Sequence, residues 1–190
     1  MYRNTFLSVM FLACCFNGSL CAQSDAQIYE RTCDAKTYPF SDPSPVATPN
    51  NSYYPYFRFD GFSMQAQEKQ WKMVVLENDY VKLTVTPEIG GKIWGAIDKV
   101  NNKEFVYTNG VVKFRDVAMR GPWTSGGIEF NFGIIGHAPT CSTPIDYLTK
   151  KNVDGSVSCH IFSYEWITRT VWNVEINLPK DKAYFTTHTT

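Results

Sequence analysis

The feature that most constrains this chain is an alternation of apolar and polar residues with period two. In the segment 80–86, Val81, Leu83 and Val85 share one face of an extended strand, and polar residues share the other. No stretch keeps a sustained helical period of 3.6 residues. The spacing of the strands and turns predicts an all-β sandwich or barrel. Further strands are expected over 92–97, 104–107, 111–114, 156–163, 166–178 and 183–190.

Charge and composition exclude several classes of protein. The 190 residues include 18 Lys plus Arg and 18 Asp plus Glu, so the formal net charge is zero. Since there is also no basic run, a nucleic-acid partner is not expected. Apolar residues reach 44%, which argues against intrinsic disorder. Aromatic residues reach 15%, which favours strands and sugar-facing surfaces over helical bundles.

Residues 1–22 have the pattern of a cleaved secretory signal peptide. Arg3 precedes the apolar run 6–13, and small residues at 19–22 precede Gln23. The apolar run is too short to cross a bilayer, so no membrane span is predicted. The expected location of the mature protein is therefore secreted or periplasmic. Lipid anchoring remains the alternative; it would use one of the three leader cysteines, Cys14, Cys15 or Cys21.

Removal of this leader leaves three cysteines, Cys33, Cys141 and Cys159, in an oxidising compartment. Three cysteines allow one disulfide and one free thiol, and the sequence leaves every pairing open. A Cys141–Cys159 bridge is preferred because it would close a short loop. The sequence contains no CxxC or HxxxH spacing, so neither a metal site nor a cofactor is predicted.

The mature chain divides into two parts. Residues 23–70 are rich in proline and carry an aromatic cluster at 53–57, which predicts an extended strap or linker. Residues 71–190 carry the predicted sandwich. The final segment 183–190 is itself strand-like, and a strand without its partners would leave an exposed edge. We therefore expect the chain to be a fragment of a larger sandwich.

The stretch 114–147 differs from the strands around it because glycines alternate with polar and aromatic side chains. Glycine lets the backbone approach a ligand closely. A tryptophan can stack on a sugar ring, while carboxylate, imidazole and amide groups bind hydroxyls or transfer protons. The stretch therefore predicts a site for a polyhydroxylated ligand. Its catalytic candidates are Glu129 and His137, and its substrate-binding candidates are Arg120, Trp123, Asn131 and Asp146.

Several of these residues also fit ordinary structural roles. Glu129 lies in an alternating stretch and fits a solvated strand residue. His137 fits a loop histidine, Arg120 fits an ion pair with Asp116, and Trp123 fits the core. The residues alone leave both interpretations open.

Two motifs add a family resemblance. The segment 76–94, with Pro-Glu-Ile-Gly-Gly at 87–91, resembles the opening of galactose mutarotase-like (aldose 1-epimerase-like) domains. The segment 123–133, followed by Gly136-His137, resembles one branch of that superfamily, an uncharacterised secreted domain often found before tetratricopeptide repeats. The resemblance covers residues 73–190 and implies an antiparallel β-supersandwich, of which this chain would hold about half.

In mutarotases of this superfamily, a histidine acts as general acid on the ring oxygen and a glutamate near the C-terminus acts as base. The resemblance implies that His137 corresponds to this histidine, whereas the C-terminal glutamate has no counterpart in this sequence. The predicted function is a secreted domain that binds a sugar or glycoside, with or without general acid/base processing. Asp146 is the available second carboxylate if a glycoside is hydrolysed.

Two functions of other classes remain open. One is a non-catalytic carbohydrate-binding module, which needs Trp123 and polar neighbours but no proton-transfer pair. The other is a structural or interaction sandwich that presents the aromatic strap to a partner protein, the role expected if tetratricopeptide repeats follow; those C-terminal repeats could themselves bind the partner.

Overall fold

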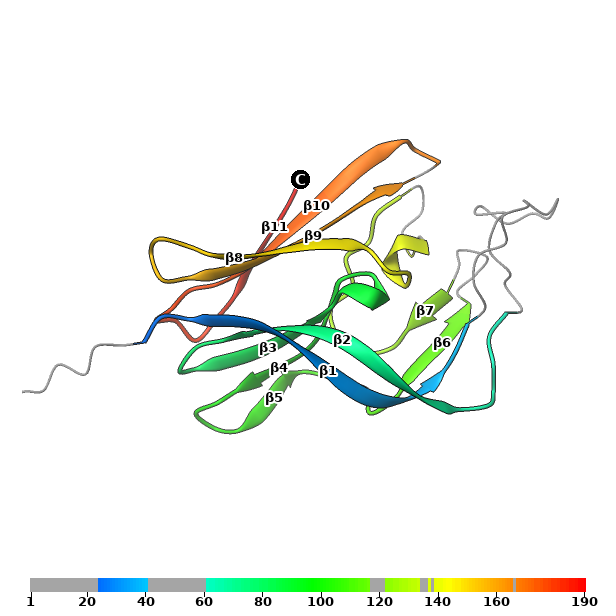
Figure 1. Cartoon of the computed structure of the whole chain (residues 1–190), viewed down its shortest axis with the longest axis horizontal. Coiled ribbons are helices and arrows are strands. Elements are labelled where there is room, and N and C mark those ends of the chain that lie inside the picture. Colours follow the sequence, from blue (N-terminus) through cyan, green and yellow to red (C-terminus); the bar gives the residue numbers. More distant parts are fainter. Residues whose placement is uncertain (1–23, 41–60, 117–121, 134–136, 138, 166) are drawn as a thin grey trace, which may run out of the picture.

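The computed structural model describes residues 24–40, 61–116, 122–133, 137, 139–165 and 167–190. These residues form an all-β sandwich, as the sequence predicts (Figure 1). No helix in these ranges is long and apolar enough to cross a membrane. The elements are β1 (Gln27–Tyr38), β2 (Gln67–Glu77), β3 (Val81–Thr86), η1 (Pro87–Ile89), β4 (Lys92–Asp98), β5 (Lys103–Val106), β6 (Val112–Asp116), β7 (Pro122–Thr124), η2 (Pro139–Cys141), β8 (Asp146–Lys151), β9 (Val157–Glu165), β10 (Thr170–Leu178) and β11 (Thr186–Thr189).

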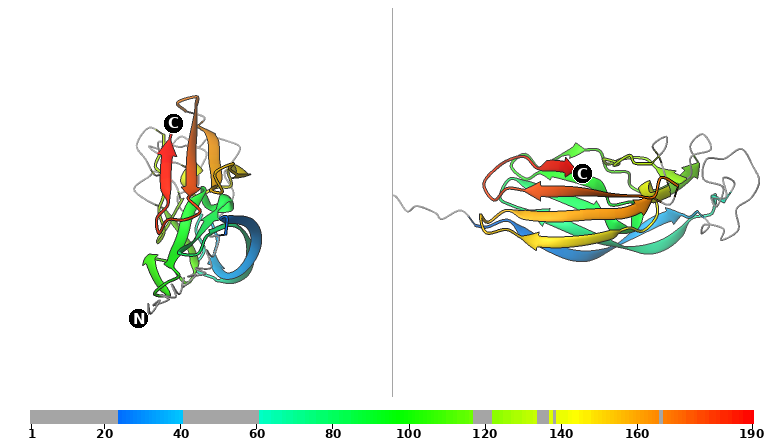
Figure 2. Two further views of the ribbon diagram at one scale, coloured as in Figure 1. Left: turned by 90° about the vertical axis from the view of Figure 1, so that its left-hand side faces the viewer. Right: turned by 90° about the horizontal axis from the view of Figure 1, so that it is seen from above.

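Two sheets form the layers of the sandwich. A seven-stranded sheet has the order β5-β4-β3-β2-β1-β6-β7, and a four-stranded sheet has the order β11-β10-β9-β8. Seen from above, the four-stranded sheet lies across the larger one (Figure 2, right). Neighbouring strands are antiparallel except for β1 and β6, which pair in parallel at Thr37–Val112 and Tyr38–Lys113. The larger sheet is therefore mixed, whereas the resemblance implies a purely antiparallel one.

The larger sheet is strongly curled (Figure 2, left). The segment after β7 returns to β4, because Ile128 and Ile93 exchange backbone hydrogen bonds of 2.8 and 3.1 Å. The Gly127 N–H also donates to the Tyr107 carbonyl oxygen at 2.8 Å, just beyond β5. The curl thereby places the glycine-rich segment 126–133 against β4, the strand that follows Gly90 and Gly91.

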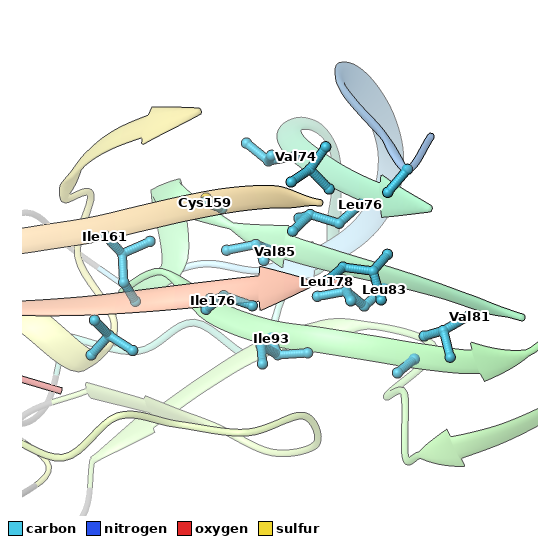
Figure 3. Close-up of a cluster of buried hydrophobic side chains, with 14 of the residues drawn as sticks. Val74, Leu76, Val81, Leu83, Val85, Ile93, Cys159, Ile161, Ile176 and Leu178 are labelled. Atoms are coloured by element: carbon cyan, nitrogen blue, oxygen red, sulfur yellow. The ribbon is translucent and has the colours of Figure 1, made fainter. Parts of the chain in front are cut away.

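The main hydrophobic core lies between the two sheets (Figure 3). The alternation seen in the sequence supplies it: Val81, Leu83 and Val85 of β3 are at most 1% exposed. From the facing sheet, Trp172 and Ile176 of β10 are equally buried. A second cluster fills part of the curl and consists of Trp71, Met73, Ile89, Trp94, Val112 and Phe114.

Three expectations differ from the structure in detail. The predicted strap contains the 12-residue strand β1, which pairs with β2 along almost its whole length. The predicted strand 166–178 begins only at Thr170, because Ile167–Arg169 form a turn in which Arg169 has a φ of 57°. Cys33, Cys141 and Cys159 are free thiols, so the preferred Cys141–Cys159 bridge is wrong. The signal peptide 1–22 and the aromatic cluster 53–57 lie outside the described residues.

Candidate functional site

The two motifs of the sequence are in contact in the structure. Gly90 has a φ of 63°, in the left-handed region that glycine adopts readily, and its N–H donates to the Thr143 carbonyl oxygen at 2.9 Å. A Cβ at Gly90 would overlap the Cys141 carbonyl group. Gly127 has a φ of 68°, and a Cβ there would overlap the Ile93 carbonyl oxygen. Glycine at both positions lets the segments 126–133 and 139–145 pack against the start of β4.

This packing brings three predicted site residues together. The Nδ1 atom of His137 lies 2.5 Å from Oε1 of Glu129. The backbone N–H of His137 donates to the Asn131 side-chain oxygen at 2.6 Å. His137 has a φ of 46°, a left-handed conformation that costs a non-glycine residue about 1 kcal/mol or more. Asn131 therefore holds the histidine backbone in a strained conformation that keeps its ring beside Glu129.

Lys92 supplies a buried positive charge next to this pair. It is 1% exposed, and its Nζ donates to the carbonyl oxygen of Thr124 at 2.8 Å and to the Thr124 hydroxyl at 3.0 Å. Burial lowers the pKa of the Lys92 ammonium, and the neighbouring Glu129 and Cys141 oppose that shift. The site thus combines an ammonium, a carboxylate and an imidazole in a largely water-excluded place.

Buried polar atoms without a hydrogen bond are concentrated here. Within the described ranges there are five such side-chain atoms: both Glu129 carboxylate oxygens, His137 Nδ1, Thr140 Oγ1 and Trp172 Nε1. The first four belong to the segment 129–140, and two of these, Glu129 Oε1 and His137 Nδ1, face each other at 2.5 Å. Glu129 Oε2 and Thr140 Oγ1 are therefore the atoms of this segment that lack any polar partner. The Trp172 ring lies 5.7 Å, between centroids, from the ring of Phe132 in the same segment. Native structures pair the large majority of buried side-chain polar atoms, so a local concentration calls for an explanation such as a missing ligand.

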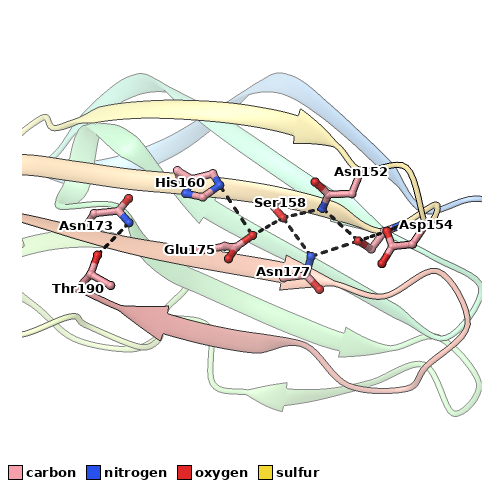
Figure 4. Close-up of polar contacts among 9 residues, drawn as sticks. Asn152, Asp154, Ser158, His160, Asn173, Glu175, Asn177 and Thr190 are labelled. Carbon is pink, nitrogen blue, oxygen red and sulfur yellow. Dashed lines mark hydrogen bonds and ion pairs between the residues drawn. The ribbon is translucent and has the colours of Figure 1, made fainter.

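A second polar cluster shows what a purely structural network looks like in this molecule (Figure 4). On the face of the four-stranded sheet that points away from the core, the Ser158 hydroxyl donates to Glu175 at 2.7 Å. The same hydroxyl accepts from Asn152 at 2.9 Å and from Asn177 at 3.0 Å. None of these four described side chains has a buried atom without a partner. The contrast singles out the Glu129–His137 cluster as the candidate site.

Comparison with known proteins gives the family of the domain. Residues 48–190 match the domain of unknown function DUF5107. The chain belongs to this family. The chain is also similar to a TPR-domain containing protein from Parabacteroides distasonis ATCC 8503, with a TM-score of 0.77 and 26% sequence identity. That match covers 88% of this chain but 29% of the other, so the chain spans less than a third of that protein.

Three further predicted site residues of this DUF5107 chain lie apart from the cluster or outside the described residues. Trp123 in β7 is half-buried and pairs in register with Arg115. Asp146 is exposed at the start of β8, where it pairs with Phe162, and no contact in the described ranges joins it to Glu129 or His137. Arg120 is not among the described residues.

Two residues of the cluster are absent from the sequence-based candidates. The sequence pattern places Lys92 only in a strand, and lysines in strands usually face solvent. The sequence does contain one indication for Lys92. Side chains two residues apart in a strand lie on the same face, so Lys92 shares a face with Trp94. In the structure, Lys92 Nζ lies 5.8 Å from the centroid of the Trp94 ring. Thr140 carries no comparable signal, since a threonine beside a proline is common in loops. Among the residues that the structure describes, no three His, Cys, Asp or Glu side chains are grouped as metal ligands would be.

Proposed function

We propose that this DUF5107 domain binds a sugar or glycoside at the Glu129–His137 pair and transfers a proton there. The observation that carries the proposal is the buried carboxylate of Glu129, whose Oε1 contacts the imidazole while its Oε2 has no hydrogen-bond partner. Buried charges in stable proteins are paired and hydrogen-bonded. An incompletely paired carboxylate beside a histidine has the form of a general acid/base pair.

The geometry assigns different tasks to the two residues. The Glu129 side chain is 10% exposed and the His137 side chain is 30% exposed. Because His137 Nδ1 is buried against Glu129, Nε2 is the ring nitrogen left to meet a ligand. Glu129 would orient the imidazole, while Nε2 exchanges the proton with a sugar oxygen.

Lys92 would hold a positive charge near Glu129, since the charge of Glu129 opposes the effect of burial on the Lys92 pKa. The two hydrogen bonds from Lys92 to Thr124 fix the ammonium at this place. Lys92 acts on Glu129 through its charge, so its proposed role is positioning rather than proton transfer.

A polyhydroxylated ligand suits the free groups of this cluster. Carboxylate oxygens accept hydrogen bonds from sugar hydroxyls, and a threonine hydroxyl both donates and accepts. Half-buried Trp123, on β7 close to the cluster in sequence, offers an apolar ring of the kind that stacks on a sugar. The resemblance to galactose mutarotase-like domains supports the same ligand class, because its two motifs form this site.

The test uses the intact protein, a glycan-array screen and, for the sugars that bind, polarimetry or product analysis. Glu129→Gln preserves side-chain shape but removes the charge, so we expect turnover to fall by about 10²-fold or more while sugar binding persists. Glu175→Gln is the matched control, because Glu175 is also a carboxylate near a histidine, with 3.8 Å between its Oε1 and His160 Nε2. An unchanged rate in Glu129→Gln would contradict proton transfer, and absence of any sugar binding would contradict the whole proposal.

The similarity to a TPR-domain containing protein favours one alternative, a protein-interaction role for this domain. In that role the sandwich would support neighbouring repeats, and neither Glu129 nor His137 would affect the partner. Wild-type protein without sugar binding, together with a protein partner whose affinity is unchanged in Glu129→Gln, would favour this alternative.

Export of the domain is a separate proposal that rests on residues 1–22. Expression in a bacterial host with mass spectrometry of the mature N-terminus tests it. A product that begins at Gln23 is expected for a cleaved signal peptide, and an acylated cysteine would establish the lipid-anchored alternative instead.

A further inference from the structure

A cavity of about 470 Å³ lies inside the curl of the seven-stranded sheet. Its walls come from the strands β1 to β6 and the connection between β5 and β6. Small-ligand sites in proteins commonly have volumes of about 300–1,000 Å³. None of the sequence-predicted site residues lines this cavity, and neither does Lys92. It is therefore distinct from the Glu129–His137 cluster.

Part of the cavity lining is apolar and includes an aromatic residue. Met73, Trp94 and Val112 line the cavity and also belong to the hydrophobic cluster inside the curl. Trp94 is 7% exposed, so most of its surface is packed and its ring position is fixed. An aromatic ring held in the lining of a cavity can contact the apolar face of a sugar ring.

Residues with uncommitted hydrogen-bonding groups line the cavity as well. They are Thr84 and Thr108, which carry hydroxyls, and Arg31, which carries a guanidinium. No side-chain hydrogen bond or ion pair joins these three groups to another described residue, and none of them is a buried atom without a partner. They are accordingly open to water or to a ligand. Hydroxyls donate and accept, which matches the hydroxyls of a sugar.

The charges around the cavity cancel. The lining contains three basic residues and three acidic residues, namely Arg31, Lys36, Lys82, Asp34, Glu68 and Glu104. A strongly anionic ligand would meet the three acidic residues and a strongly cationic ligand the three basic residues. Repulsion between like charges would weaken binding for both kinds of ligand. The lining therefore suits a neutral ligand with many hydroxyl groups.

We infer that this cavity is a binding site for a neutral sugar, either a free monosaccharide or a single unit of a glycan. The inference does not rest on the Glu129–His137 site, because the two sites share no lining residue. They are nevertheless adjacent, since the Lys92 ammonium lies 5.8 Å from the centroid of the Trp94 ring.

The test measures sugar binding to the intact protein by saturation-transfer NMR and calorimetry. The probes are D-glucose and D-galactose for free sugars, and cellobiose and lactose for units within a glycan. Thr84→Phe places a larger side chain in the cavity and should abolish binding. Arg31→Ala removes one uncommitted donor at an exposed position and should weaken binding by about tenfold. Because Arg31 is exposed, this second variant keeps the test valid if Thr84→Phe does not fold.

One control accompanies these variants. Thr32→Phe makes the same change on β1 at an exposed residue that does not line the cavity, so binding should be unchanged. Binding that survives both Thr84→Phe and Arg31→Ala would overturn the cavity site. The proposed catalytic site is judged separately, by the turnover of Glu129→Gln, so failure of one proposal can be told from failure of the other. Absence of binding for all four probes would overturn the cavity site as well.

Discussion

Gly127→Ala tests whether the glycine-rich segment is held on β4 in the way that forms the site. Gly127 has a φ of 68°, and its Cβ position overlaps the carbonyl oxygen of Ile93. An alanine can be accommodated only if the backbone moves away from β4. Such a movement would also displace Glu129, two residues later in the same segment.

The expected loss of stability follows from the contacts at this position. A left-handed conformation costs a residue with a Cβ about 1–2 kcal/mol. Movement of the segment also strains three backbone hydrogen bonds of 2.8, 2.8 and 3.1 Å, which join Gly127 to Tyr107 and Ile128 to Ile93. Each such bond contributes about 1 kcal/mol, and two of the three would be lost or weakened if the segment shifts. We therefore expect the free energy of unfolding to fall by about 3–4 kcal/mol.

Urea unfolding of the intact protein measures this loss as a shift of the midpoint at constant slope. Gly110→Ala is the matched control, because a Cβ there meets no atom within 4 Å and its φ is outside the left-handed region. The control should stay within about 0.5 kcal/mol of the wild type or be slightly more stable. If Gly127→Ala unfolds at the same urea concentration as Gly110→Ala, the segment is not fixed on β4, and the close packing of Gly127 against Ile93 does not position Glu129.

Three other predictions concern charge and titration. Lys92→Met should lower the free energy of unfolding by about 1–3 kcal/mol, because it leaves the buried Thr124 carbonyl oxygen and hydroxyl without their donor and removes a positive charge near Glu129. In a Glu129→Gln background, Lys92→Met should lower the free energy of unfolding by about 1–2 kcal/mol less than it does in the wild type. A double-mutant cycle measures this difference, and additive effects of the two substitutions would show that the two charges do not interact. Burial raises the pKa of the Cys159 thiol to about 12, so iodoacetamide at about pH 8 should leave it unmodified in the folded protein while half-buried Cys33 reacts. Mass spectrometry of the alkylated protein checks this, and equal labelling of both thiols would contradict it. Burial tends to raise the pKa of Glu77, but hydrogen bonds from a lysine and a tyrosine lower it below 4.5 overall. Its stabilisation is therefore present above about pH 4.5 and lost as the pH falls through the folded value, so Glu77→Gln should lessen the acid sensitivity of the urea midpoint. An identical pH dependence in both proteins would refute the assignment.

The strands that could be predicted from the sequence are those with one buried face. In β3 and β10, buried residues alternate with partly exposed ones, and this is the pattern that period two detects. Strand β1 has no such pattern, because Thr37 is its only buried residue and charged side chains occupy both of its faces. Its place in the sheet depends on pairing with β2 and β6, which a local pattern does not contain.

The candidate site was predictable only in its local part. Glu129, Asn131 and His137 lie within nine residues of each other, so a glycine-rich polar stretch could indicate all three. Lys92 could not be placed with them, because it meets Thr124 only through the curl of the sheet, across 32 residues of sequence. Asp146 shows the opposite error: it is close in sequence to His137 but begins a strand of the other sheet.

The distribution of unpaired polar atoms is the strongest reason to regard this cluster as functional. Buried charged groups are often no more stabilising than apolar residues of the same size. Selection for stability alone would therefore replace Lys92 and Glu129, or would complete the hydrogen bonds of Glu129 as it has around Ser158. Instead, Glu129 Oε2 and Thr140 Oγ1 have no hydrogen-bond partner, and Glu129 Oε1 meets only His137 Nδ1, near a fully buried lysine. Violations of local rules that gather at one place are expected at functional sites, and a ligand with hydroxyl groups would satisfy these atoms.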